Sequence, residues 1–149
     1  MNSRQGCIAG SIFRLYVCGA AVLMWYMGFH EDRSINSVIA QTSEGYWTLW
    51  ILFFGGVVGL LDVILNDYAS AFKRPPLFTY ARTHRHFGLA LLAFAHTCIA
   101  FISVIKIGSP GAAIFALWNT FFIIGFSLLD AHQRALDSQK EAVCRPVFN

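Results

Sequence analysis

Four polar side chains that could carry chemistry lie inside long apolar stretches of the sequence. Arg14 and Asp62 carry opposite charges, His96 is ionisable, and Asn119 has an amide that both donates and accepts hydrogen bonds. Polar groups are costly inside a membrane, so each one needs a partner or a function. These four residues are the candidates for the chemistry of the protein, and their roles depend on the elements that position them.

Four apolar segments have the length that a helix needs to cross a bilayer, roughly 20 residues each. The chain is 56% hydrophobic and only 13% charged, whereas soluble domains carry roughly 25% charged residues. We therefore expect an all-α integral membrane protein with a single domain over residues 1–149. Its helices, at about 7–29, 46–67, 84–107 and 111–131, form an antiparallel bundle, and a short C-terminal tail follows over residues 132–149.

The basic residues are distributed unevenly between the two sides of this bundle. Nine of the 11 Lys and Arg residues fall on the side of the N-terminus, the 67–86 loop and the tail, and only Arg33 and Lys106 fall on the other side. Because basic residues collect on the cytoplasmic side, we expect both termini to be cytoplasmic. A bacterial inner (cytoplasmic) membrane is the simplest location, and an organellar inner membrane is the alternative.

Arg14 and Asp62 fall at similar shallow depths near the cytoplasmic side, given a rise of about 1.5 Å per helical residue. An ion pair between them is one way to accommodate two charges inside apolar helices. The alternative is that each side chain extends separately to the nearby interface.

His96 and Asn119 fall near the middle of the third and fourth helices. A short turn at Gly108–Gly111 joins these helices into a hairpin, so the two side chains could form a hydrogen bond across it. Thr97 and Thr120 are alternative partners for the same purpose. Such bonds hold helices together in lipid, and the second hypothesis for His96 is a proton-relay or ligand-binding histidine.

Small residues at a spacing of four mark the expected sites of close helix packing. Gly55 and Gly59 have this spacing in the second helix, and Ala112 and Ala116 have it in the fourth. Small side chains let helix backbones approach closely in a membrane. The pattern fits packing within one chain and packing between copies equally well.

The loops on the two sides of the membrane differ in character. The outer loop over residues 30–45 is polar and too short for a domain, so we expect a solvated connector. Aromatic residues at the helix ends, such as Trp25 and Trp47, are expected to anchor the protein at the interface. The inner loop is basic, and we expect it to contact anionic headgroups or a protein partner through Lys73, Arg74, Arg82, Arg85 and His86.

No enzyme motif such as H-E-x-x-H or G-x-S-x-G is present in the sequence. We therefore predict no catalytic residue, metal ligand or cofactor, and no basic stripe indicates nucleic-acid binding. The favoured function is an accessory subunit of a larger membrane complex, with lipid and other subunits or a second copy as partners. One alternative is a holin-like or ion-conducting pore with Asp62, His96 and Asn119 along its path. The other is a haem- or metal-binding redox protein, for which only His96 lies deep enough to be an axial ligand.

Overall fold

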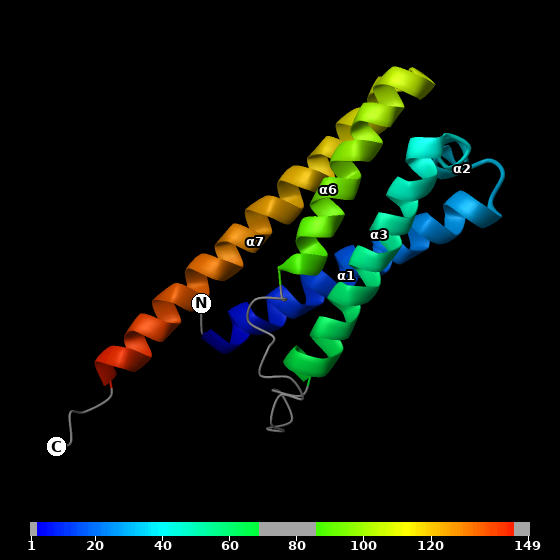
Figure 1. Ribbon diagram of the computed structural model, residues 1–149. Helices are drawn as coiled ribbons and strands as arrows, with labels where there is room; N and C mark the ends of the chain where they lie inside the picture. The colour runs from blue at the N-terminus through cyan, green and yellow to red at the C-terminus, as the bar shows by residue number, and fades with distance from the viewer. Residues whose placement is uncertain (1–2, 69–85, 145–149) are drawn as a thin grey trace.

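The structure is a computed structural model that describes residues 3–68 and 86–144, and their regular structure is helical. Four helical stretches are long and apolar enough to cross a membrane, at Gly10–His30, Ser43–Leu65, Phe87–Ile107 and Pro110–His132. The predicted all-α, four-helix membrane class is therefore confirmed. The elements, in chain order, are α1 (Ser3–His30), α2 (Ile35–Ala40), α3 (Ser43–Asp62), η1 (Val63–Tyr68), α6 (Phe87–Ile102), η2 (Ser103–Ile107) and α7 (Pro110–Cys144) (Figure 1).

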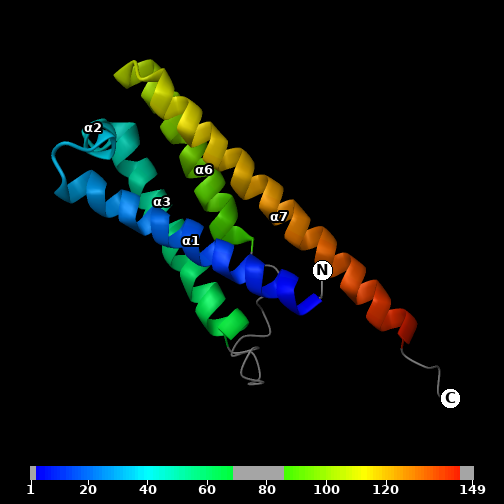
Figure 2. The ribbon, with the colours of Figure 1, turned by 180° about the vertical axis from the view of Figure 1, so that it is seen from behind.

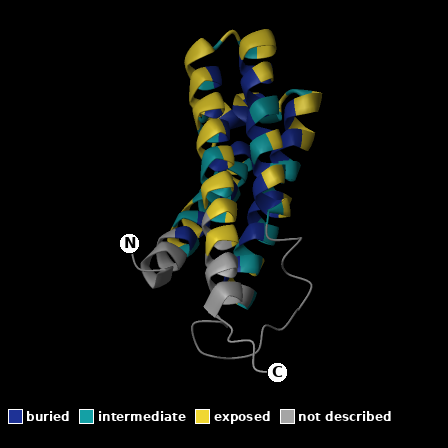
Figure 3. Ribbon diagram, turned by 90° about the vertical axis from the view of Figure 1, so that its left-hand side faces the viewer, coloured by how far each residue is buried: buried dark blue, intermediate teal, exposed yellow. Residues whose placement is uncertain are grey.

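The four long helices alternate in direction and pack in the order α1, α3, α6, α7 (Figures 1 and 2). Half of the most apolar part of the α6 span is buried inside the protein, compared with 22% for the spans of α1 and α7. Buried positions gather where the helices face one another, and exposed positions line the outside (Figure 3). Helices α3 and α6 therefore form the centre, and α1 and α7 form its two edges.

The glycines of α3 bring the helices on both of its sides close to it. A Cβ on Gly55 would lie 3.0 Å from the Cβ of Leu91 in α6, and a Cβ on Gly59 would collide with Sγ of Cys18 in α1. Gly88 of α6 faces the same region, since its own Cβ would lie 2.9 Å from the backbone nitrogen of Gly59. The small-residue face of α3 is thus used for packing within the chain.

The loop over residues 30–45, which the sequence predicts to be a solvated connector, is more ordered than that. Residues 35–40 form α2, whose N-cap Ser34 accepts a hydrogen bond from the backbone nitrogen of Ser37 at 3.1 Å. Thr42 caps α3 in the same way, accepting from the nitrogen of Gly45 at 3.0 Å. Ile39 is 1% exposed, and Asn36 and Ser37 are also buried. Oγ of Ser34 donates to the carbonyl oxygen of Met27 in α1 at 3.0 Å, so both apolar and polar side chains hold this loop on the bundle.

Several of the aromatic residues expected at the interface also pack against one another. Trp25 of α1 lies 4.5 Å from Phe53 and 5.2 Å from Trp50 of α3, measured between ring centroids. Tyr46 and Trp47 are exposed, as an anchoring role requires. The aromatic residues therefore serve both to join α1 to α3 and to face the surroundings.

The α6–α7 hairpin has the short turn that the sequence predicts. Gly108 adopts the left-handed conformation with φ of 68°, which glycine accepts without strain. The backbone nitrogen of Ser109 donates to the carbonyl oxygen of Ser103 at 2.8 Å, and α7 begins at Pro110. Helix α7 then continues to Cys144, so the predicted polar tail begins as an extension of the last membrane helix.

Candidate functional site

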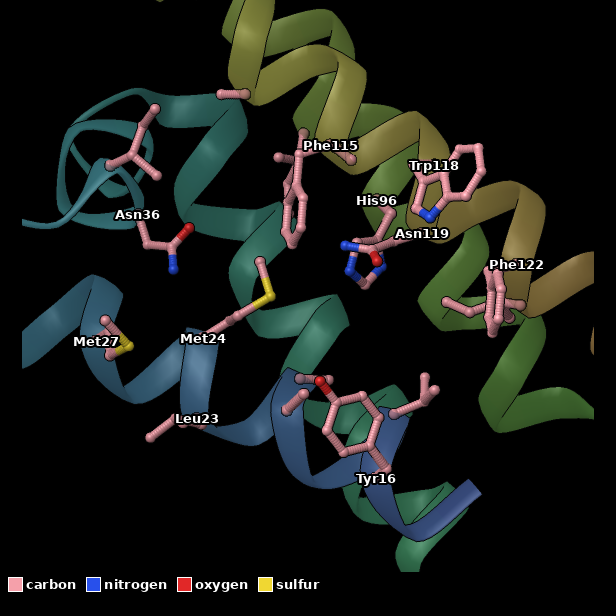
Figure 4. A pocket seen from close by; sticks show the side chains of 18 of the residues that line it. Tyr16, Leu23, Met24, Met27, Asn36, His96, Phe115, Trp118, Asn119 and Phe122 are labelled. Atoms are coloured by element: carbon pink, nitrogen blue, oxygen red, sulfur yellow. The ribbon is translucent and has the colours of Figure 1, made fainter. Parts of the chain in front are cut away.

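A cleft of about 690 Å³ lies between α1 and α7. These two edge helices diverge toward the end of the protein that holds α2 (Figures 1 and 2). The volume falls within the roughly 300–1,000 Å³ of small-molecule sites in proteins. Residues from α1, α2, α6 and α7 line it, so the cleft is enclosed on several sides (Figure 4).

Aromatic rings close one end of this cleft, and α2 closes the other. Phe13 of α1 stacks on Phe126 of α7 with 3.9 Å between ring centroids, where the two helices meet. At the opposite end, Asn36 and Ile39 of α2 contribute to the lining. The rim includes exposed side chains from both edge helices, Tyr16 at 75% and Trp118 at 66% exposure. The cleft therefore opens sideways, toward the lipid that surrounds two membrane spans.

His96 lies in the part of the cleft wall that α6 contributes (Figure 4), and it is only 4% exposed. Its Nδ1 lies 2.8 Å from the carbonyl oxygen of Leu92. A carbonyl oxygen only accepts hydrogen bonds, so Nδ1 carries the hydrogen, and Nε2 of the neutral ring is left as an acceptor. Within the part of the chain that the structure describes, Nε2 has no hydrogen-bond partner.

Asn119 of α7 also lines the cleft, and its side chain is partly buried. The hydrogen bond between His96 and Asn119 that the sequence suggests is not formed among the described residues. The alternative pair makes the contact across the hairpin instead, with the hydroxyl oxygens of Thr97 and Thr120 3.5 Å apart. His96 and Asn119 therefore keep polar atoms available to the cleft.

Arg14 and Asp62 are brought together between α1 and α3. Nη1 of Arg14 lies 3.7 Å from Oδ2 of Asp62, and the two residues are 3% and 10% exposed. Nε of Arg14 also donates to the carbonyl oxygen of Gly10 at 3.3 Å. Neither charged residue lines the cleft, so the ion pair and the cleft are separate features of the protein.

The other residues singled out in the sequence fall in different parts of the chain. Gly55 and Gly59 pack against neighbouring helices, while Ala112 and Ala116 contribute to the cleft wall. His86 precedes α6 and makes no side-chain cap hydrogen bond. The remaining basic residues of the inner loop lie outside the described residues, namely Lys73, Arg74, Arg82 and Arg85.

The sequence analysis does not predict the cleft, although one signal for it is present. Phe115, Trp118, Asn119 and Phe122 follow the spacing i, i+3, i+4 and i+7, which places them on one face of a helix. All four line the cleft. An amide among three aromatic rings on one face of a membrane helix indicates a binding surface more specifically than any single residue does.

Within the described ranges 3–68 and 86–144, no group of three or more His, Cys, Asp or Glu side chains could hold a metal ion. The cleft contains one histidine and no other side chain of these four types. Comparison of the chain with protein-family models, curated proteins and solved structures gives no match. The geometry of the cleft is therefore the basis on which a function is proposed.

Proposed function

We propose that this protein is an accessory membrane protein that holds an uncharged lipid in the cleft between α1 and α7. The observation that carries the proposal is the cleft itself, which lies between two membrane spans, has a volume of about 690 Å³ and has a nearly apolar lining. No charged side chain belongs to its lining. A charged headgroup inside it would have no ionic partner, which is costly at membrane depth.

A specific binding site has polar groups in fixed positions. A groove that is simply filled by bulk lipid does not need them. Three buried or partly buried side chains supply them here, His96 from α6, Asn119 from α7 and Asn36 from α2. His96 is fixed by its hydrogen bond to the carbonyl oxygen of Leu92 at 2.8 Å. Asn36 is 6% exposed. These groups favour a ligand with one polar end and an apolar remainder.

We propose that the protein performs this binding role as an accessory subunit of a larger membrane complex. A bound lipid would let such a subunit supply or stabilise a lipid-soluble component beside its partner. The pore hypothesis is less well supported, because Asp62 pairs with Arg14 and does not line the cleft with His96 and Asn119. Native co-purification in mild detergent tests the complex, and a partner of constant stoichiometry is the expected result.

Lipid extraction from the purified protein tests the binding role. The informative variant is Ala112→Phe, which adds a ring inside the cleft, and its matched control is Gly111→Phe, where an added Cβ meets no atom within 4 Å. We expect one uncharged lipid to be enriched with the wild-type protein and with Gly111→Phe, and to be lost from Ala112→Phe. A lipid content equal in all three proteins, or equal to that of the bulk membrane, would contradict the proposal.

A further inference from the structure

We infer that the ligand of the cleft is a lipid-soluble phenol, such as a hydroquinone with an apolar tail, whose hydroxyl group donates a hydrogen bond to Nε2 of His96. This inference rests on the proposed lipid-binding function and specifies the chemical class of the lipid. It also predicts which of two closely related head groups the cleft prefers.

The hydrogen bonding of His96 determines which kind of polar group fits beside it. Nδ1 donates to the carbonyl oxygen of Leu92 at 2.8 Å, so Nε2 of the neutral ring accepts. The residue is 4% exposed and lines the cleft, and Nε2 has no partner within residues 3–68 and 86–144. A buried acceptor of this kind is satisfied by a ligand that donates, which a hydroxyl group does and a carbonyl group does not.

The aromatic side chains of the cleft favour a ring over an aliphatic head group. Phe13 and Tyr16 of α1 face the cleft from one side, and Phe115, Trp118 and Phe122 of α7 face it from the other (Figure 4). Flat rings gain additional attraction from such neighbours through stacked or edge-to-face contact. The exposed residues of the rim then leave an apolar tail free to extend into the bilayer.

The amide of Asn119 adds a second polar contact without selecting between head groups. An amide both donates and accepts, so Asn119 fits a hydroxyl or a carbonyl oxygen equally well. The amide of Asn36, the hydroxyl group of Tyr16 and the indole N–H of Trp118 also fit either kind of oxygen. The difference between a hydroquinone and its quinone therefore depends on the acceptor Nε2 of His96. Since a quinone oxygen would place an acceptor against the acceptor Nε2, we expect the hydroquinone to bind about tenfold more tightly.

The test compares binding of a benzoquinol that bears a ten-carbon alkyl tail with binding of the corresponding benzoquinone. The full-length protein is held in lipid nanodiscs, the quinol is kept reduced under argon, and affinity is measured by thermophoresis. A ten-carbon aliphatic alcohol is the third probe, because it shares the hydroxyl group and lacks the ring. The expected order of affinity is benzoquinol, then benzoquinone, with the aliphatic alcohol weakest.

The variant His96→Phe keeps the ring and removes the acceptor. We expect it to lose the preference for the quinol while it still binds the quinone, which shows in the same measurement that the cleft is intact. The matched control is His30→Phe, because Nδ1 of His30 has the same type of contact, 3.1 Å from the carbonyl oxygen of Tyr26, on an exposed residue away from the cleft. This control should keep the tenfold preference.

The results for the wild-type protein separate a failure of this inference from a failure of the proposed lipid-binding function. Equal affinity for quinol and quinone overturns the role of His96, and so does a preference for the quinone. Binding of the aliphatic alcohol as tight as that of the quinol overturns the choice of a phenol. If no probe binds while an extracted lipid still depends on residue 112, the inference fails and the lipid-binding function stands. If no probe binds and no lipid is extracted, both fail.

Discussion

Arg14 and Asp62 show at the level of single residues how the protein keeps charges inside its membrane helices. Nη1 of Arg14 and Oδ2 of Asp62 lie 3.7 Å apart, and both residues are nearly buried. Loss of one charge from a buried pair leaves the other uncompensated, which costs far more than the loss of both charges together. The pair is therefore expected to be sensitive to single substitutions and tolerant of an exchange.

Single neutralisation of this pair should destabilise the protein strongly. We expect Asp62→Leu to lower the free energy of unfolding by about 3 kcal/mol, because it breaks a buried ion pair. The double variant Arg14→Leu/Asp62→Leu should recover most of that loss, and so should the exchange Arg14→Asp/Asp62→Arg. Thermal unfolding in detergent measures all of them. Losses that simply add in the double variant would show that the two charges do not interact.

The sequence singles out both residues of this pair, because charges inside apolar helices are costly, but it leaves an ion pair and separate extension to the interface as two alternatives. The contact of His96 is different. Depth alone suggests Asn119 as its partner, whereas the ring bonds to the carbonyl oxygen of Leu92 one helical turn earlier. Depth along a helix can be counted in the sequence, but the direction of a side chain around the helix depends on how neighbouring helices are rotated. That rotation depends on packing across the whole protein.

At the scale of the elements, α3 and α1 approach each other closely at one glycine. Gly59 faces Cys18 so closely that no Cβ fits between them. We expect Gly59→Ala to cost about 1–3 kcal/mol, as overpacking in a filled core does. The double variant Cys18→Ala/Gly59→Ala should recover part of that loss by removing the sulfur atom.

The control for this prediction is Gly19→Ala, also in α1, where an added Cβ meets no atom within 4 Å. This change should leave the melting temperature unchanged or raise it, since alanine favours helix more than glycine does. The comparison uses thermal unfolding in one detergent. Equal effects at Gly59 and Gly19 would mean that the proximity of Cys18 has no energetic consequence.

Ile39 is the most deeply buried apolar side chain of helix α2. Ile39 is 1% exposed, whereas Val38 beside it is 42% exposed. We expect Ile39→Ala to cost about 3 kcal/mol and to loosen the outer end of the cleft, which α2 helps to line. Val38→Ala is the matched control and should have little effect. Limited proteolysis within residues 31–42 measures the loosening, and equal cleavage of the two variants would contradict the prediction.

The four membrane spans could be predicted from the sequence, and signals for the order of the loop are present in it, but the cleft could not be predicted. Apolar length and composition locate the four spans, because these quantities reflect the bilayer directly. The N-caps Ser34 and Thr42 are recognisable signals for α2 and the start of α3. A cleft between α1 and α7, by contrast, results from the angle between two helices that are distant in sequence, and no local pattern encodes that angle.

At the scale of the whole molecule, the orientation in the membrane stays a prediction. Nine of the 11 basic residues support a cytoplasmic location of both termini. A fluorescent-protein fusion at the C-terminus should then be bright in a bacterial host, and alkaline phosphatase inserted at Ser109 should be active. The opposite pattern at both positions would reverse the orientation. It would also move the α2 end of the cleft to the cytoplasmic side.

The arrangement of the molecule as a whole gives the cleft its character. Helices α3 and α6 provide a packed centre through Gly55, Gly59 and Gly88. Helices α1 and α7 lie at the edges and meet at the Phe13–Phe126 stack, with the cleft between them. Because this centre is formed without closing the ring of helices, a lateral cleft is left beside the packed core.

Native mass spectrometry of the protein released from detergent micelles tests the central claim most directly. If the cleft holds a specific lipid, the wild-type chain and Gly111→Phe should each appear with one added mass that survives removal of the detergent. The same mass should be absent from Ala112→Phe, whose new ring occupies the cleft. A bare chain in all three proteins, or an identical adduct on all three, would contradict the account of the cleft as a lipid site.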